Sequence, residues 1–135
     1  MENKIVIDAT ETVLGRLASY ATKQALLGKT VTIVNCEEAI IKGERRMIIN
    51  EYKTLVYRGG HSLKGPFHIK RSPERLVKRT IRGMLDYKYK RGEDAFKRIM
   101  CYDGVPKEFA GEKTISIKTP SLRKNYKLKE LAKEF

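Results

Sequence analysis

The order of apolar runs near the N-terminus predicts a strand, a helix and a second strand. The apolar, β-branched run at 4–8 predicts a buried strand. A helix cap at Thr10 or Thr12 is followed by apolar residues at every third or fourth position, which predicts a helix that ends at Gly28. Residues 30–35 form a second buried strand, and the β–α–β order implies a right-handed crossover with parallel pairing.

The rest of the chain predicts further elements that are separated by polar loops. Short apolar runs at 39–42 and 99–102 predict a third and a fourth strand, and residues 114–118 alternate as a short extended piece would. Glycines and prolines mark loops at 58–71, and a basic loop is expected at 86–91. Helices are predicted over 44–57, from Ser72 and Pro73 to Leu85, over 92–100 and over 122–135. Without a repeat or a linker, residues 1–135 are expected to form a single α/β domain.

The charge of this chain is distributed unevenly. Its 135 residues carry 29 Lys and Arg against 16 Asp and Glu, which gives a formal net charge of +13. Residues 1–57 contribute +1 and residues 99–135 contribute +3, whereas residues 58–98 contribute +9. This concentration of positive charge indicates a polyanionic partner and predicts that segment 58–98 faces it.

The composition also excludes several classes of protein. Hydrophobic residues make up 41% of the chain, which is too many for a solvated coil. No apolar run approaches the roughly 20 residues of a transmembrane helix, and no large apolar face for a membrane surface is predicted. The N-terminus carries charges where a signal peptide would be apolar, so we expect a cytoplasmic protein without a membrane partner.

The basic segment interleaves cations with aromatic rings, which is typical of RNA-binding surfaces. Lys and Arg side chains neutralise phosphates, and tyrosine rings stack on unpaired bases. Base or sugar contacts are expected from Tyr87, Tyr89 and His68. Phosphate contacts are expected from Arg58, Lys64, Lys70, Arg71, Arg75, Arg79, Arg82, Lys88, Lys90, Arg91, Lys97 and Arg98.

Nucleotide-binding and catalytic motifs are weak in this sequence. The junction after the first predicted strand lacks the glycine-rich fingerprint that lets a backbone approach a pyrophosphate. The triplet Gly28-Lys29-Thr30 follows a predicted helix, whereas a phosphate loop must precede one. Asp8 ends the first strand, but the pattern places no second carboxylate, histidine or serine beside it. We therefore expect no catalytic residue, cofactor or small-molecule substrate.

A metal site is not expected either. Cys36 and Cys101 lie far apart in the sequence, and together with His61 and His68 they lack the paired spacing of zinc ligands. Both cysteines are more readily explained as small apolar thiols near strands, kept reduced in a cytosol.

Two long stretches of the chain resemble the large-subunit ribosomal protein L13 family, in its archaeal and eukaryotic branch. They contain IDATETVLGRLAS with LLGKTVTIVNCEEAIIKG, and GPFHIKRSPERLVKRTIRGML with YKRGEDAFKRIMCYDGVP. The resemblance runs from Ile5 to Pro106 and departs at Asp86, where the family usually has proline. It implies a three-layer α/β/α fold around a four-stranded parallel sheet of order 3-2-1-4, together with extended basic loops and a C-terminal helix.

The same resemblance implies a structural constituent of the large ribosomal subunit, without enzymatic activity. Such a protein binds and stabilises large-subunit rRNA during assembly and contacts neighbouring ribosomal proteins in the cytoplasm. Two alternatives stay open at this point. One is a free RNA-binding regulator with the same fold, and the other is a small enzyme that acts on RNA or a nucleotide at the strand ends near Asp8 and Asn35.

Overall fold

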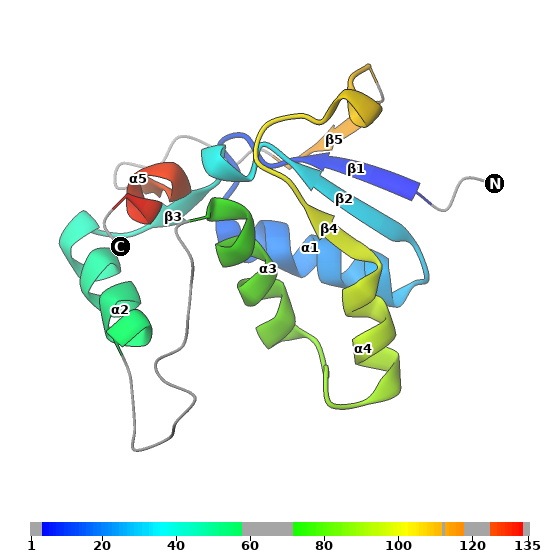
Figure 1. The fold of residues 1–135 in the computed structure, drawn as a ribbon, viewed down its shortest axis with the longest axis horizontal. Coiled ribbons are helices and arrows are strands. Elements are labelled where there is room, and N and C mark those ends of the chain that lie inside the picture. Colours follow the sequence, from blue (N-terminus) through cyan, green and yellow to red (C-terminus); the bar gives the residue numbers. More distant parts are fainter. Residues whose placement is uncertain (1–3, 58–71, 112, 118–124, 134–135) are drawn as a thin grey trace.

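The described part of the chain is built around one parallel sheet. The computed structural model describes residues 4–57, 72–111, 113–117 and 125–133. Four strands pair in parallel in the order β4-β2-β1-β5, so that the two longest strands lie in the middle (Figure 1). These strands are β1 (Lys4–Asp8), β2 (Thr30–Val34), β4 (Ile99–Cys101) and β5 (Thr114–Ser116).

The edge strands of this sheet differ from those we expected. The strand predicted at 39–42 does not belong to the parallel sheet, so the order differs from the 3-2-1-4 arrangement of the four expected strands. The edge beside β2 is β4, and the edge beside β1 is β5, which was expected only as an extended piece. When the four parallel strands are numbered among themselves, however, they do follow 3-2-1-4.

Helix α1 (Leu14–Leu26) connects β1 to β2, as the apolar spacing predicts. It ends before Gly28, whose φ of +96° lies in the left-handed region that favours glycine. The predicted threonine cap is wrong, because the N-cap residue is Val13 and the Thr12 hydroxyl donates to the Thr10 carbonyl at 3.2 Å. The buried residues of the helix are Leu14, Leu17, Ala18, Ala21, Thr22 and Ala25.

Three helices lie on the same side of the parallel sheet. Helix α1 packs against α3 (Pro73–Met84), α4 (Lys90–Lys97) and β2 (Figure 1). Helix α2 (Arg45–Tyr57) lies beyond the carboxyl ends of the strands. Among its described residues, the connection from β4 to β5 contains one short 3-10 turn, η2 (Lys107–Phe109), and no longer helix. The described residues therefore form two layers, and the third layer that the resemblance implies is not among them.

A second, two-stranded sheet joins the middle of the chain to its C-terminal part. The 3-10 turn η1 (Cys36–Glu38) leads into β3 (Ile40–Lys42), which pairs antiparallel with β6 (Asn125–Lys127). The C-terminal helix predicted over 122–135 is shorter in the structure, because α5 contains only Leu128–Ala132. Residues 125–127 are extended instead, since pairing with β3 buries the Tyr126 side chain.

One hydrophobic core connects these elements. Alternate residues of the strands point toward α1 and α3. A fully buried valine, leucine or isoleucine side chain stabilises the folded state by roughly 1.5–3 kcal/mol relative to an exposed one. Two leucines of α5, Leu128 and Leu131, reach the same core, so the C-terminal part is held by apolar packing. The largest fully buried side chains include Ile7, Leu17, Ile33, Leu76, Ile81 and Ile99.

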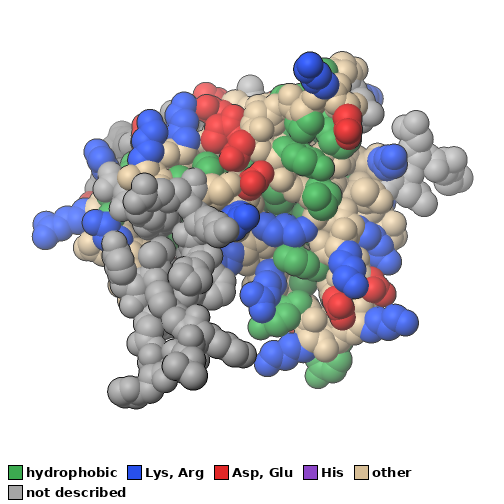
Figure 2. All heavy atoms as spheres, viewed as in Figure 1, with side chains coloured by type: hydrophobic (Ala, Val, Ile, Leu, Met, Phe, Trp, Pro, Cys, Tyr) green, Lys and Arg blue, Asp and Glu red, His purple; other side chains and the backbone are tan. Residues whose placement is uncertain are grey.

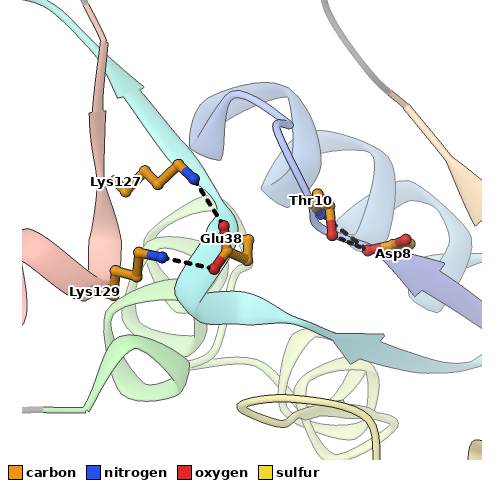
Figure 3. A network of polar contacts seen from close by, with 5 residues as sticks. All are labelled: Asp8, Thr10, Glu38, Lys127 and Lys129. Carbon is orange, nitrogen blue, oxygen red and sulfur yellow. Dashed lines mark hydrogen bonds and ion pairs between the residues drawn. The ribbon is translucent and has the colours of Figure 1, made fainter.

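Glu38 adds a polar link between η1 and the C-terminal part (Figure 3). Its two carboxylate oxygens accept hydrogen bonds from the ammonium groups of Lys127 at 2.9 Å and Lys129 at 3.0 Å. These bonds hold the pKa of Glu38 below its ordinary value of 4.5, against a small opposing effect of burial. A carboxyl whose pKa is lowered by folding stabilises the folded state above its ordinary pKa.

We therefore expect Glu38→Gln to lower stability at neutral pH by about 1 kcal/mol or less, because both partners are partly exposed. The difference from the unsubstituted protein should disappear as the pH falls from 4.5 through the lower folded pKa, since Glu38 is then protonated. Urea unfolding at a series of pH values measures this. Glu108→Gln is the matched control, an exposed glutamate with no ion pair among the described residues. Equal pH profiles for the two variants would contradict the prediction.

Candidate nucleic-acid interface

Helix α3 separates apolar residues from arginines, as its sequence spacing predicts. Pro73 occupies the first turn, where its missing N–H is of no consequence. The Ser72 hydroxyl does not cap the helix and instead hydrogen-bonds the Asp103 carboxylate. Arg75 and Arg82 are exposed on the outer side. The buried side consists of Pro73, Leu76, Val77 and Ile81.

Two cations of α3 differ from their exposed neighbours. Lys78 turns inward and donates to the carbonyls of Phe96, at 3.0 Å, and Ile99, with its ammonium 4.2 Å from the centre of the Phe96 ring. Burial lowers the pKa of Lys78. Arg79 is half-buried near Tyr52 of α2. Burial raises the pKa of Tyr52, and the Glu51 carboxylate raises it further, whereas the positive charge of Arg79 lowers it. Lys78 therefore joins α3 to the end of α4 and is partly buried.

A tight turn at 85–89 connects α3 to α4. Leu85 is buried and anchors its beginning. The Asp86 carbonyl accepts a hydrogen bond from the Tyr89 N–H at 3.0 Å. That carbonyl also lies against Gly92, where a Cβ atom would stand 2.1 Å from the oxygen. Only glycine at position 92 is compatible with this close approach, which holds the turn in place.

Tyr87 projects from this turn toward α3. The Arg82 guanidinium lies over its ring, with 4.3 Å between the guanidinium carbon and the ring centre. Tyr87 is 39% exposed. The two side chains border a hollow of about 450 Å³, hereafter the 79–87 hollow. Its described lining residues are Arg79, Thr80, Arg82, Gly83 and Tyr87.

Tyr89 belongs to the same turn and is 72% exposed. It borders a smaller hollow of about 220 Å³, whose wall is apolar where Met84 and Leu26 contribute and basic where Arg91 contributes. The two tyrosines thus border two different hollows beside the same turn, each with an arginine in the lining.

Most of the described predicted contacts lie on α3, the 85–89 turn and the beginning of α4. We call this region the α3–α4 basic surface, and it consists of Arg75, Arg79, Arg82, Tyr87, Lys88, Tyr89, Lys90 and Arg91. Lys97 is exposed and pairs with Glu93 at 3.3 Å. Arg98 is half-buried and donates to the Ala25 carbonyl at the end of α1, at 3.0 Å. The other predicted contacts lie outside the described residues, namely Arg58, Lys64, His68, Lys70 and Arg71.

One cluster of acidic side chains surrounds Asp103. Burial raises the pKa of Asp103, and the nearby carboxylates of Glu74 and Glu37 raise it further. In the view of Figure 2 a group of acidic side chains lies in the upper part and a smaller group lies near α4, among Lys and Arg side chains that spread over α3 and α4. Residues 73–98 carry more cations than carboxylates, so a polyanion is attracted to this part of the molecule.

The strand ends at Asp8 are closed by hydrogen bonds. One carboxylate oxygen of Asp8 accepts from the Thr10 N–H at 3.0 Å and the Thr10 hydroxyl at 2.6 Å (Figure 3). The same oxygen accepts from the Asn35 side-chain amide at 3.1 Å. Asn35 itself has a φ of +56° and directly precedes η1. Both residues of the enzyme alternative thus contribute to the local fold, which leaves no oriented nucleophile and base between them.

The two cysteines are close in space although they are distant in sequence. The Cys36 thiol is buried and donates a hydrogen bond to the Ile33 carbonyl at 3.7 Å. Its interaction with the neighbouring Cys101 thiol and its burial raise the pKa of Cys36, so this thiol stays protonated at neutral pH. Neither histidine of the zinc alternative lies in the described ranges, and those ranges contain no group of three metal-ligating side chains. None of the described helices is long and apolar enough to cross a membrane.

Comparison with known proteins identifies the family. The model of the family described as Ribosomal protein L13 matches residues 2–108. The chain belongs to the ribosomal protein L13 family. Large ribosomal subunit protein uL13 of Archaeoglobus fulgidus is 43% identical over 88% of this chain and 75% of the relative. The uL13 protein of Methanosarcina barkeri is 47% identical over 87% of this chain and 84% of the relative. That of Haloarcula marismortui is 42% identical over 80% of this chain and 72% of the relative.

Membership in the L13 family confirms the resemblance that the sequence motifs carry, including its archaeal character. The family consists of structural ribosomal proteins, so the chain is not an enzyme. The family model ends within η2, and the elements β5, β6 and α5 follow it.

Sequence reasoning missed two features of the α3–α4 basic surface. The sequence places Lys78 among the arginines of α3, but its side chain faces inward. Sequence reasoning also overlooked Gly83, which lines the 79–87 hollow. A glycine inside a helical pattern costs about 1 kcal/mol relative to alanine and therefore indicates a packing or functional reason. That signal was available at Gly83.

Proposed function

We propose that the chain is a structural constituent of the large ribosomal subunit that binds large-subunit rRNA through the α3–α4 basic surface. The observation that carries this proposal is the convergence of cations from α3, the 85–89 turn and α4 around two exposed tyrosines. Guanidinium and ammonium groups neutralise phosphates, and the rings are available for unpaired bases. The names of the relatives, which place them in the large ribosomal subunit, support the same function.

In this role the protein stabilises the rRNA fold during assembly and stays in the cytoplasm as part of the large subunit. The compact α/β core holds the basic surface in a fixed shape, so little conformational entropy is lost when RNA binds. The acidic region around Asp103 does not face RNA and is left for neighbouring ribosomal proteins.

Sedimentation of native cell extracts tests this function against the regulator alternative. We expect the protein to be recovered quantitatively with large ribosomal subunits and to be released as the salt concentration rises. Each phosphate contact contributes about 0.7–0.9 to the slope of log K against log salt, so six cations predict a slope of magnitude about 4 or more. A substantial free pool in the extract, with the subunits deficient in the protein, would favour the regulator instead.

A further inference from the structure

We propose that the 79–87 hollow holds a single unstacked nucleotide of the bound RNA. This inference rests on the proposed rRNA binding and goes beyond it, because it assigns one side-chain pocket to one flipped-out residue. The hollow has about 450 Å³, and its described lining consists of two arginines, a tyrosine, a threonine and a glycine. This combination supplies a flat stacking surface, cationic donors and an acceptor within one concave site.

The concave shape argues against a contact with duplex RNA alone. A-form RNA presents a shallow minor groove and a deep major groove that side chains cannot enter. The bases of an RNA duplex are stacked inside it, so no base projects into a hollow on the protein. A nucleotide that leaves its stack does project. Sequence-specific RNA recognition uses such unpaired residues, which stack on aromatic rings or arginine planes.

The side chains around the hollow match the parts of one nucleotide. Arg82 lies over the Tyr87 ring at 4.3 Å, and this flat pair provides a surface against which a base can stack. The Thr80 hydroxyl donates to the Leu76 carbonyl at 2.9 Å, which leaves its lone pairs to accept from a 2′-hydroxyl or a base amino group. The guanidinium groups that line the hollow supply donors for the phosphate.

Gly83 creates the space for the base. It lies on α3, is exposed, and a Cβ atom at this position would meet nothing within 4 Å. A longer side chain at position 83 therefore enters the hollow rather than the core. The neighbouring turn is rigid, because Leu85 is buried and the Asp86 carbonyl is held against Gly92. The pocket is thus formed before RNA binds, which limits the entropy lost on binding.

Substitution at Gly83 tests the proposal without a change of charge. The probe is in-vitro transcribed large-subunit rRNA of the source organism, and binding is measured over a range of salt concentrations. Gly15→Leu is the matched control, because it adds the same side chain at an exposed helical glycine outside the α3–α4 basic surface, where a Cβ atom would also meet nothing within 4 Å. We expect Gly15→Leu to bind like the unsubstituted protein and Gly83→Leu to bind about tenfold more weakly at every salt concentration, with the same slope.

A second variant and a crosslink keep the test independent of folding. Tyr87→Ser removes the ring and should weaken binding to a similar extent, since base–aromatic stacking is lost. With rRNA that contains 4-thiouridine, we expect a crosslink from one nucleotide to the peptide that carries Tyr87, and its loss in Gly83→Leu. Unchanged binding by both Gly83→Leu and Tyr87→Ser would overturn the nucleotide site while the rRNA function stands. Absence of rRNA binding by the unsubstituted protein would overturn both.

Discussion

Reversing the charge of Arg75 and Arg82 together is expected to lower the affinity for large-subunit rRNA by about a hundredfold or more near physiological salt. Both arginines are exposed on α3, and a charge-assisted hydrogen bond is worth about 1.5–3 kcal/mol. The double variant Arg75→Glu/Arg82→Glu loses two phosphate contacts and adds repulsion. The slope of log K against log salt should therefore fall in magnitude by roughly 1.5–2. Filter binding over a salt series measures both quantities.

The control for this experiment has the same change in net charge on another part of the molecule. Lys107 and Lys113 are exposed on the connection between β4 and β5, away from α3. The double variant Lys107→Glu/Lys113→Glu alters the overall field but removes no cation of the α3–α4 basic surface. We expect a smaller loss of affinity and little change of slope. If the two double variants behave alike, rRNA binding depends on net charge, and the surface that we propose is wrong.

The parts of the fold that were predictable are those in which local chemistry and tertiary packing agree. The spacing from Leu14 to Ala25 determines α1 because the same residues fill the core beneath the sheet. Pro73 marks the start of α3 correctly, since its ring is compatible only with a first turn at this point. Neither prediction depends on a distant partner, so the sequence alone is sufficient for both.

The errors come from elements whose partners are distant in the sequence. An apolar run at 39–42 indicates a strand, but not which strand it pairs with, and β3 pairs with residues that follow it by more than eighty positions. Ser72 has the chemistry of a helix cap, yet its hydroxyl bonds Asp103 on the connection that follows β4. These choices are made by tertiary contacts, which local periodicity does not contain.

The candidate surface was predictable in its location and only partly in its detail. Counting charges places most of the positive excess in segment 58–98, and the structure gathers the described part of it on α3, the turn and α4. Which cations face outward is not encoded in the count. Lys78 donates to two carbonyls inside the protein, whereas Arg82, four residues later, is exposed over Tyr87.

The 85–89 turn gives the second large expected effect, which follows from Gly92→Ala. A Cβ atom at position 92 would stand 2.1 Å from the Asp86 carbonyl oxygen and 2.3 Å from its carbon, and backbone atoms cannot yield as a flexible side chain would. The turn must therefore move away from α4, and overpacking of this kind costs about 1–3 kcal/mol. Urea unfolding should show this loss of stability. The displaced Tyr87 and Tyr89 should also weaken rRNA binding.

Gly15→Ala separates the effect of close contact from the effect of helix propensity. Gly15 is exposed in the first turn of α1, and a Cβ atom there would meet nothing within 4 Å. Alanine is favoured over glycine in a helix by up to about 1 kcal/mol, so this variant should be slightly stabilised and should bind rRNA normally. Gly92 also lies within a helix, and propensity alone predicts the same stabilisation. Because the two predictions for Gly92→Ala have opposite signs, an increase in its stability would show that the contact with Asp86 does not hold the turn.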